Sequence, residues 1–249
     1  MSVVRAVPAI SIRLLAAACA AATLLAAQPA RAQEPLSFFK NYFVTGDYAV
    51  RGVSLFGKGR NGTAQAAVSI TGFPEDSVDV LAAFLYVQSA EEVQGTGINR
   101  AKFNGYDLGA GTSSFAKALN PASQTRVCYL KATDPHRMVT YRADVLRFLP
   151  VKANGKLAVN GAHTVALPDA GFSWNDDAKE VSGSGPHPIG ASLVIVYRDP
   201  AKPLKAIVIY DGGVTKPAAE TLTQPIRGYF DPSSGPPVPK SARMTHTAG

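Results

Sequence analysis

The sequence predicts an all-β fold, an antiparallel β-sandwich of jelly-roll-like order with one short helix. Short runs of β-branched and aromatic residues recur along the chain, and clusters of Gly, Pro and Asn separate them. Strand patterns do not alternate with helix patterns, as they would in a parallel sheet. A hydrophobic content of 46% is sufficient for a core and excludes a wholly disordered chain.

Two strands are expected near the start of the domain, at residues 48–56 and 63–71. In the second, every other position from 64 to 70 is Ala, Val or Ile, which is the period of a strand with one buried face. Residues 56–62 lie between the two strands, are rich in glycine and predict a hairpin loop.

Two longer apolar runs predict buried strands, at residues 78–88 and 190–197. The second run is almost entirely apolar and β-branched, which is typical of a strand buried on both faces. A turn at residues 199–203 follows it, so residues 205–210 are its expected hairpin partner.

Shorter elements are expected between these runs. Residues 141–149 predict the one short helix, ending before Pro150. Residues 152–156 contain an Asn-Gly pair, which predicts a hairpin turn because both residue types tolerate a positive φ. Short strands are expected on either side of residue 160, at 157–159 and 164–167.

Residues 1–32 have the pattern of a signal peptide that is cleaved after export. Arg5 and Arg13 give a positive start, residues 14–27 are an unbroken apolar run, and residues 30–32 fit a small-x-small cleavage site. The apolar run is shorter than the roughly 20 residues that a membrane span needs. We therefore expect a secreted protein, extracellular, at the cell surface or periplasmic, with no membrane span after signal removal.

The rest of the chain divides into an arm at 33–47, a β-sandwich domain at 48–230 and a tail at 231–249. The tail is rich in Pro, Ser and Gly, which predicts a flexible, disordered segment. Cleavage removes Cys19 and leaves Cys128, so no internal disulfide is expected.

The charge of the exported chain is modest. The leader holds three arginines and no acid, which leaves 22 basic and 18 acidic side chains and a net charge of about +4. The basic side chains are scattered and do not interleave with aromatic ones, so no nucleic-acid partner is expected.

Five short motifs occur in an order that resembles an uncharacterised family of secreted prokaryotic β-sandwich domains found in surface and extracellular proteins. The motifs span the domain and are Ala83–Tyr86, Phe103–Gly105, Tyr141–Val145, Gly190–Tyr197 and Ile207–Gly212. The resemblance implies a fold and a compartment. It implies no catalytic residues.

Sequence motifs for catalysis are missing. The chain has no G-x-S-x-G nucleophile motif, no paired His or Cys spacing for zinc and no phosphate-binding glycine loop. The histidines are far apart in sequence and are expected in loops or at the surface: His136, His163, His187 and His246. The acids Glu91, Glu92 and Glu180 are likewise expected at the surface. We therefore predict no catalytic residue and no cofactor.

A long loop at residues 169–188 is the expected binding region, because long loops tend to carry binding sites. Its candidate residues are Phe172, Trp174, Asn175, Asp176 and Asp177. The indole of Trp174 either stacks on a sugar ring or folds back to cover one end of the domain. The three polar side chains either bind calcium or form a solvated loop.

These features favour a non-enzymatic module for binding or structure at the cell surface, with a carbohydrate or adhesive role. Its expected partner is a surface or extracellular polysaccharide or a protein. Two alternatives stay open: a hydrolase acting on extracellular polymers, and a subunit of an envelope assembly that pairs through an exposed edge strand.

Overall fold

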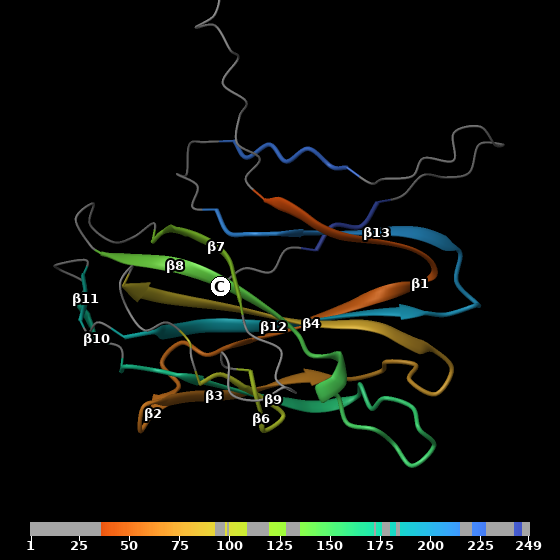
Figure 1. Ribbon diagram of the computed structural model, residues 1–249, viewed down its shortest axis with the longest axis horizontal. Helices are drawn as coiled ribbons and strands as arrows, with labels where there is room; N and C mark the ends of the chain where they lie inside the picture. Colours follow the sequence, from red (N-terminus) through yellow and green to blue (C-terminus); the bar gives the residue numbers. More distant parts are fainter. Residues whose placement is uncertain are drawn as a thin grey trace, which may run out of the picture. The chain divides into compact units, whose positions relative to one another are not determined.

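The computed structural model describes residues 36–92, 98, 100–108, 120–127, 135–171, 173–175, 180–182, 185–214, 221–227 and 242–245. These residues belong to one unit, Pro35–Gly249. Their regular secondary structure is almost entirely strand, in antiparallel sheets, which confirms the prediction of an all-β, antiparallel fold (Figure 1). In this part of the chain no helix has the length and apolar composition to cross a bilayer.

The strands form three sheets. The largest has the order β13-β1-β12-β4-β8-β7, with β13 at Leu204–Asp211, β1 at Ser37–Ser54, β12 at His187–Arg198, β4 at Asp79–Glu92, β8 at His136–Asp144 and β7 at Asn120–Arg126. The second has the order β2-β3-β9-β5-β6, with β2 at Gly59–Arg60, β3 at Thr63–Ile70, β9 at Gly161–Pro168, β5 at Lys102–Phe103 and β6 at Tyr106–Asp107. The third is a small hairpin of β10 (Ser173–Asn175) and β11 (Glu180–Ser182).

Strand β1 passes from one layer of the fold to the next. Residues 37–45 pair with β13, whereas residues 46–54 pair with β12. The change of partner falls between Thr45 and Gly46, and a Cβ at Gly46 would overlap the backbone of Tyr197 in β12. Figure 1 shows β1 running from the upper layer, beside β13, to the central layer, beside β12. A long strand shared in this way joins the two layers covalently.

The main hydrophobic core lies between the two larger sheets. It combines side chains from the central strands, such as Leu85 and Ile195, with side chains from the second sheet, such as Val68 and Leu167. All four of these side chains are fully buried. Burial of an aliphatic side chain of this size contributes about 1.5–3 kcal/mol, so this cluster is the main source of stability.

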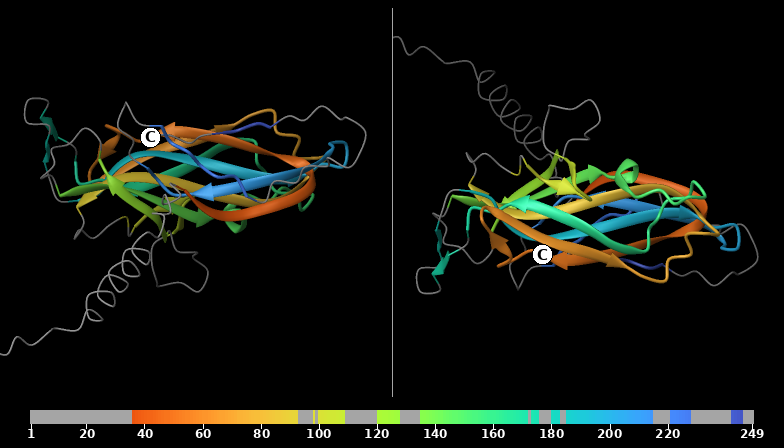
Figure 2. Two further views of the ribbon diagram at one scale, coloured as in Figure 1. Left: turned by 90° about the horizontal axis from the view of Figure 1, so that it is seen from above. Right: turned by 90° about the horizontal axis from the view of Figure 1, so that it is seen from below.

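A second cluster covers the opposite face of β4 and β12. Phe84 and Val196 lie on this face, and Ile207 of β13 and Tyr42 of β1 pack against them. Seen from above, β1 and β13 overlie the central strands (Figure 2). Strands β4 and β12 are therefore buried on both faces, as the apolar run 190–197 predicts.

The six-stranded sheet curls until its two ends approach each other. Gly213 follows β13, and a Cβ at this position would lie 2.9 Å from Oγ1 of Thr140 in β8 and 3.1 Å from Oγ of Ser123 in β7. The sheet is therefore nearly closed, and a side chain at position 213 would require these two hydroxyls to move.

The predicted strands are confirmed where their burial pattern is strong, but several pairings differ. Strand β3 has the expected alternation, and β4 and β12 cover the two apolar runs. The first strand begins at Ser37 rather than at residue 48, so part of the predicted arm belongs to β1. The predicted hairpins of 48–56 with 63–71 and of 190–197 with 205–210 are wrong, because β3 pairs with β9 and β13 pairs with β1.

The predicted helix at 141–149 is also wrong. Residues up to Asp144 continue β8, and only Leu146–Phe148 form a single 3-10 turn. The spacing of apolar residues in this segment suits a helix, but pairing of β8 with β4 and β7 on both sides determines its conformation. The turn at 152–156 is present, with a positive φ at Gly155 alone and one bridge between Val151 and Leu157 in place of flanking strands.

Within the predicted tail, residues 242–245 are described, and they contact the strand β1. Arg243 forms an ion pair with Asp47, and the hydroxyls of Thr245 and Tyr48 lie 2.9 Å apart. Composition alone did not indicate these contacts of Arg243 and Thr245, and the flexibility of the tail at 231–249 stays a prediction.

Candidate functional site

Three polar side chains from three of the sequence motifs meet on the outer face of the central strands. The hydroxyl of Tyr86 in β4 donates a hydrogen bond of 2.5 Å to Oδ1 of Asp211, the last residue of β13. The guanidinium of Arg142 in β8 forms an ion pair with the other carboxylate oxygen of Asp211. Asp211 is buried, so this group connects β13, which covers the outer face, to the central strands β4 and β8.

The tyrosine of this group keeps its proton near neutral pH. Burial raises the pKa of Tyr86 to about 12, although the charge of Arg142 acts in the opposite direction. Burial lowers the pKa of Arg142, which also stacks over the ring of Phe39 with its Cζ 3.4 Å from the centroid. General acid–base chemistry works best with a pKa near the operating pH. The geometry of Tyr86 and Arg142 therefore suits a structural tie better than proton transfer.

The motif Phe103–Gly105 forms a two-residue hairpin turn between β5 and β6. Asn104 has φ 50° and Gly105 has φ 81°, as a turn of this mirror-image type requires. The Asn104 side chain donates to the carbonyl of Phe148 at 3.1 Å, and its Oδ1 accepts from the backbone N–H of Thr164 at 3.0 Å. The side chain of Asn104 therefore joins this turn to the 3-10 turn Leu146–Phe148 and to β9.

His163 is part of the same network and is buried, which corrects the expectation that the histidines lie at the surface. Its Nε2 lies 2.8 Å from the carbonyl of Val159, so this nitrogen carries the proton and donates. Its Nδ1 then accepts from Asn104 at 3.2 Å, and the ring stacks on Phe103 with centroids 5.8 Å apart. Both ring nitrogens are used within the fold.

His136 and His187 are buried as well, with ring centroids 5.8 Å apart. Nδ1 of His187 lies 3.8 Å from Oδ1 of Asp169, which is also buried. Asp169 and His187 lie at the two ends of the predicted binding loop, residues 169–188, and between them the backbone N–H of Ala170 donates a hydrogen bond of 3.0 Å to the carbonyl of Pro186. Buried polar groups therefore close the neck of the loop. His246 lies outside the described residues.

Glu91 is buried, which corrects its expected place at the surface. The hydroxyl of Tyr141 donates a 2.7 Å hydrogen bond to Oε2 of Glu91. Burial raises the pKa of Glu91, and the hydrogen bond from Tyr141 partly offsets this effect. Burial and the neighbouring carboxylate both raise the pKa of Tyr141. Glu92, the next residue, is half-buried, and the side chain of Glu180 lies outside the described residues.

The predicted binding residues fall on a short hairpin. Trp174 and Asn175 belong to β10, where they pair with Val181 and Glu180 of β11. Their side chains lie outside the described part of the structure, as do the residues Phe172, Asp176 and Asp177. The structure thus places β-structure within the predicted loop and leaves the roles of these five residues as predictions.

Metal binding stays a prediction too. Within the described ranges no group of three or more His, Cys, Asp or Glu side chains is arranged to hold a metal ion. The proposed calcium ligands Asp176 and Asp177 lie outside these ranges, and so does Cys128. An open depression on the surface is lined by Gly57, Lys58, Thr63 and Gln65, beside the strand β2.

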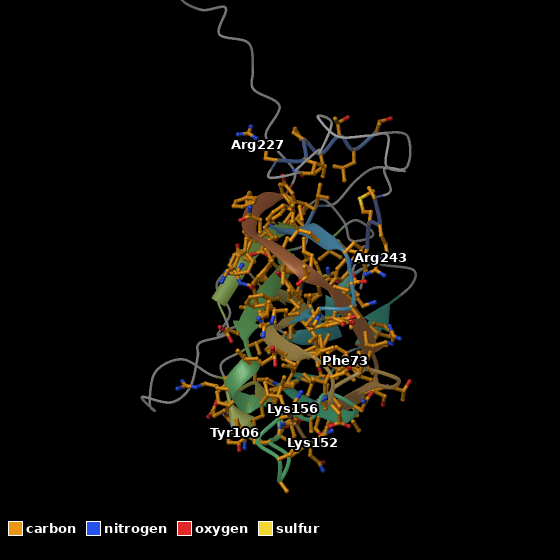
Figure 3. The ribbon with its side chains drawn as sticks, turned by 90° about the vertical axis from the view of Figure 1, so that its right-hand side faces the viewer. Phe73, Tyr106, Lys152, Lys156, Arg227 and Arg243 are labelled. Atoms are coloured by element: carbon orange, nitrogen blue, oxygen red, sulfur yellow. The ribbon has the colours of Figure 1, made fainter. Side chains whose placement is uncertain are left out.

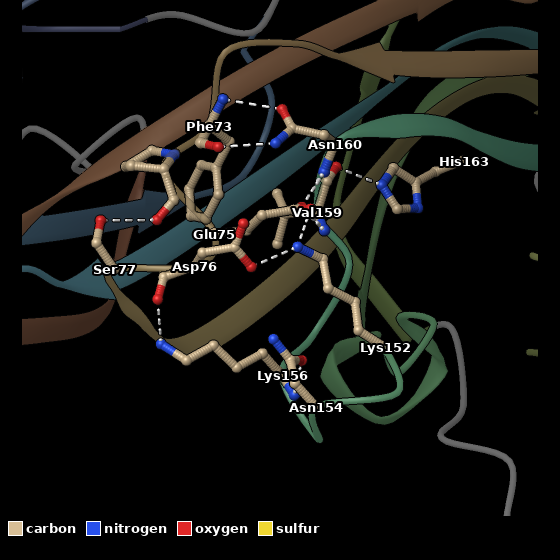
Figure 4. A network of polar contacts seen from close by, with 11 residues as sticks. Phe73, Glu75, Asp76, Ser77, Lys152, Asn154, Lys156, Val159, Asn160 and His163 are labelled. Carbon is tan, nitrogen blue, oxygen red and sulfur yellow. Dashed lines mark hydrogen bonds and ion pairs between the residues drawn. The ribbon is translucent and has the colours of Figure 1, made fainter.

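A second polar network joins two loops at one end of the second sheet (Figure 4). Oε2 of Glu75 accepts backbone hydrogen bonds of 2.8 Å from both Val159 and Asn160. Lys152 forms an ion pair of 2.5 Å with the other oxygen of Glu75. Burial alone would raise the pKa of Glu75, but the hydrogen bonds from Lys152, Asn160 and Val159 outweigh it and lower the pKa to about 2.

Comparison with known proteins gives no match: no family model, no curated protein and no solved structure matches this chain significantly. The site is therefore defined by its geometry alone. Sequence reasoning placed Tyr86, Arg142 and Asp211 in motifs without assigning them a role. One feature common to the three residues could have indicated a role. Each is an ionisable side chain within or beside an apolar strand motif, and a buried ionisable side chain requires a hydrogen-bonding or charged partner.

Proposed function

We propose that the exported chain is a secreted β-sandwich of jelly-roll-like order that serves as a binding or structural module at or outside the cell surface. The export signal in residues 1–32 supports the compartment. The hydrophobic core between two antiparallel sheets supports the architecture.

The observation that carries this proposal is the buried group of Tyr86, Arg142 and Asp211. The polar side chains of three sequence motifs hold two layers together, and burial raises the pKa of Tyr86 to about 12, far from neutral pH. Because these motif residues hold the sheets together, the loops of the domain are the segments suited to contact a partner. The expected partner is a polysaccharide or a protein of the cell surface.

We place the contact surface on the hairpin β10–β11. The buried pair Asp169–His187 and the backbone bond from Ala170 to Pro186 fix the base of this segment. A fixed base reduces the conformational entropy that binding must overcome. The indole of Trp174 is the proposed contact for a sugar ring.

The test measures retention and turnover together. Chain beginning at Gln33 is incubated with cell-envelope and exopolysaccharide fractions, and both bound protein and released products are measured. We expect retention without product release, and a loss of retention of at least tenfold in Trp174→Ala. Tyr106→Ala removes another aromatic, 55% exposed in the β5–β6 turn, and serves as the matched control. Product release by the unmodified chain, or equal retention of both variants, overturns the proposal and favours the polymer hydrolase.

A second candidate, a subunit of an envelope assembly, is supported by the edge strand β13. In the described sheet β13 pairs with β1 on one side only, and Leu204 and Phe38 beside it are 54% and 47% exposed. An edge with apolar side chains is a surface on which another strand can add. The native mass of secreted material tests this candidate: a higher oligomer supports it, and a clean monomer argues against it.

A further inference from the structure

We propose that Asp47 and Tyr48 form a binding site for an arginine-bearing extended segment, and that residues 242–245 of this chain are its tethered, exchangeable occupant. The site lies at the crossing of β1 between the two layers, next to Gly46. This proposal goes beyond the proposed function and does not depend on it.

One arginine makes most of the contacts. Nη2 of Arg243 donates to Oδ1 of Asp47 at 2.7 Å and to the carbonyl of Tyr48 at 3.3 Å. Nε of Arg243 lies 3.2 Å from the Tyr48 hydroxyl, and its Cζ lies 4.3 Å from the centroid of the Tyr48 ring. The guanidinium is thus held by charge, by hydrogen bonds and by stacking at once.

Contacts that do not involve Arg243 hold the Asp47 carboxylate in place. Its Oδ1 accepts the backbone N–H of Tyr48 at 2.9 Å. Its other oxygen, Oδ2, binds Lys205 at 2.9 Å and faces Lys202 at 3.9 Å. The two lysines therefore occupy one side of the carboxylate and leave Oδ1 to the arriving arginine.

The contact pattern selects arginine over lysine. A planar guanidinium can stack on Tyr48 while it donates to both Asp47 and the hydroxyl, whereas an ammonium group is a compact charge that cannot do all three. Thr245 adds a hydroxyl contact of 2.9 Å to Tyr48, which sets the direction of the segment.

The occupant is held at the surface and is therefore exchangeable. The Arg243 side chain is 59% exposed, whereas the Asp47 side chain is 12% exposed. Figure 3 shows Arg243 at the side of the covering layer, away from Lys152 and Lys156 at the opposite end. A partner segment that carries an arginine can take the same place once residues 242–245 leave it.

The experiment uses the full chain. Arg243→Ala empties the site, and a labelled peptide with the sequence of residues 240–249 is titrated into this variant and into the unmodified chain. We expect the peptide to bind the variant at least tenfold more tightly than the unmodified chain, whose own segment competes. A peptide in which lysine replaces arginine at the position of Arg243 is expected to bind at least tenfold more weakly.

Two outcomes overturn the proposal. Equal binding of the arginine and lysine peptides excludes a guanidinium site, and no binding to folded Arg243→Ala chain excludes a site altogether. Asp47→Asn in the same background is expected to abolish binding. If Asp47→Asn does not fold, Tyr48→Phe tests the same site by removing the hydroxyl alone. Peptide binding to this variant is expected to weaken at least threefold. Unchanged peptide binding to Tyr48→Phe also contradicts the proposed contacts. None of these results bears on retention by envelope fractions.

Discussion

The buried carboxylate of Asp211 forms an ion pair with Arg142, whose side chain is 27% exposed, although three strands, β1, β12 and β4, lie between their own strands in the order of the sheet. The pair can form because β13 folds over the outer face of the central strands and brings its last residue onto β8. Tyr86 of β4 completes the contact. The near-closure of the sheet therefore depends on a polar tie as well as on the apolar cluster beneath it.

Acid is expected to weaken the fold through Glu75. Because its pKa is lowered to about 2 in the folded chain, its contribution is complete above the unfolded value near 4.5 and is lost as pH falls toward 2. Glu75→Gln should lower the free energy of unfolding at pH 7 by on the order of 1–2 kcal/mol, allowing for solvent screening. Urea unfolding from pH 7 to pH 2 should show the two curves converging, and a constant difference would argue against this assignment.

Glu91 is expected to act in the opposite sense. Its pKa is raised by burial, so its folded state is favoured while it is protonated, and stability falls as pH rises from 4.5 through the raised value. Glu91→Gln keeps an acceptor for Tyr141 and removes this loss. The stability of the variant relative to the unmodified chain should therefore rise between pH 4 and pH 8. Parallel pH profiles of the two proteins would contradict a buried, ionisable Glu91.

Asn104 is expected to be critical for the second sheet. Asn104→Ala removes acceptors and donors for Thr164, Phe148 and His163 and leaves a Cβ-bearing residue other than Asn or Gly at φ 50°. The expected cost is about 2–4 kcal/mol in the free energy of unfolding. Asn154→Ala is the control, because Asn154 makes one exposed hydrogen bond and has no positive φ. Similar losses in both variants would show that the network is unimportant.

Gly46 is expected to be required where β1 changes layers. Gly46→Ala places a methyl group on the backbone of Tyr197, which should cost about 1–3 kcal/mol or disrupt pairing with β12. Gly52→Ala lies on the same strand, where a Cβ meets the movable hydroxyl of Ser192 at 3.1 Å and the carbonyl oxygen of Ala191 at an ordinary contact distance of 3.4 Å. Thermal unfolding should rank Gly52→Ala as the milder change; the reverse order is incompatible with the observed crossing.

Local patterns predicted the strands but not their partners. The alternation in β3 and the apolar runs of β4 and β12 predict these strands correctly, because the pattern of apolar residues in each strand follows the burial of its own faces. The partner of β13 is not readable, since it depends on where β1 crosses between layers. The segment 141–149 shows the same limit, because neighbouring strands override a pattern that also suits a helix.

The candidate site was predictable in part for a related reason. The motifs contained Tyr86, Arg142 and Asp211, but their meeting depends on the curl of the sheet. His163 and Glu91 were expected at the surface because their residue types are usually exposed, and only tertiary contacts with Asn104 and Tyr141 make their burial favourable.

The most direct test of the central claim is a double-mutant cycle on Arg142 and Asp211, measured by urea unfolding at pH 7. The claim is that these motif residues hold the layers together. Arg142→Met should cost about 3 kcal/mol, because it leaves the buried carboxylate of Asp211 without its counter-charge. Asp211→Asn should cost less, because the Arg142 side chain that it leaves is 27% exposed. The double variant should cost less than the sum by more than about 1 kcal/mol. The same cycle on Asp79 and Arg198, whose side chains are both 55% exposed, should show little coupling. Additive losses at Arg142 and Asp211, or coupling no larger than that of the exposed pair, would contradict the account.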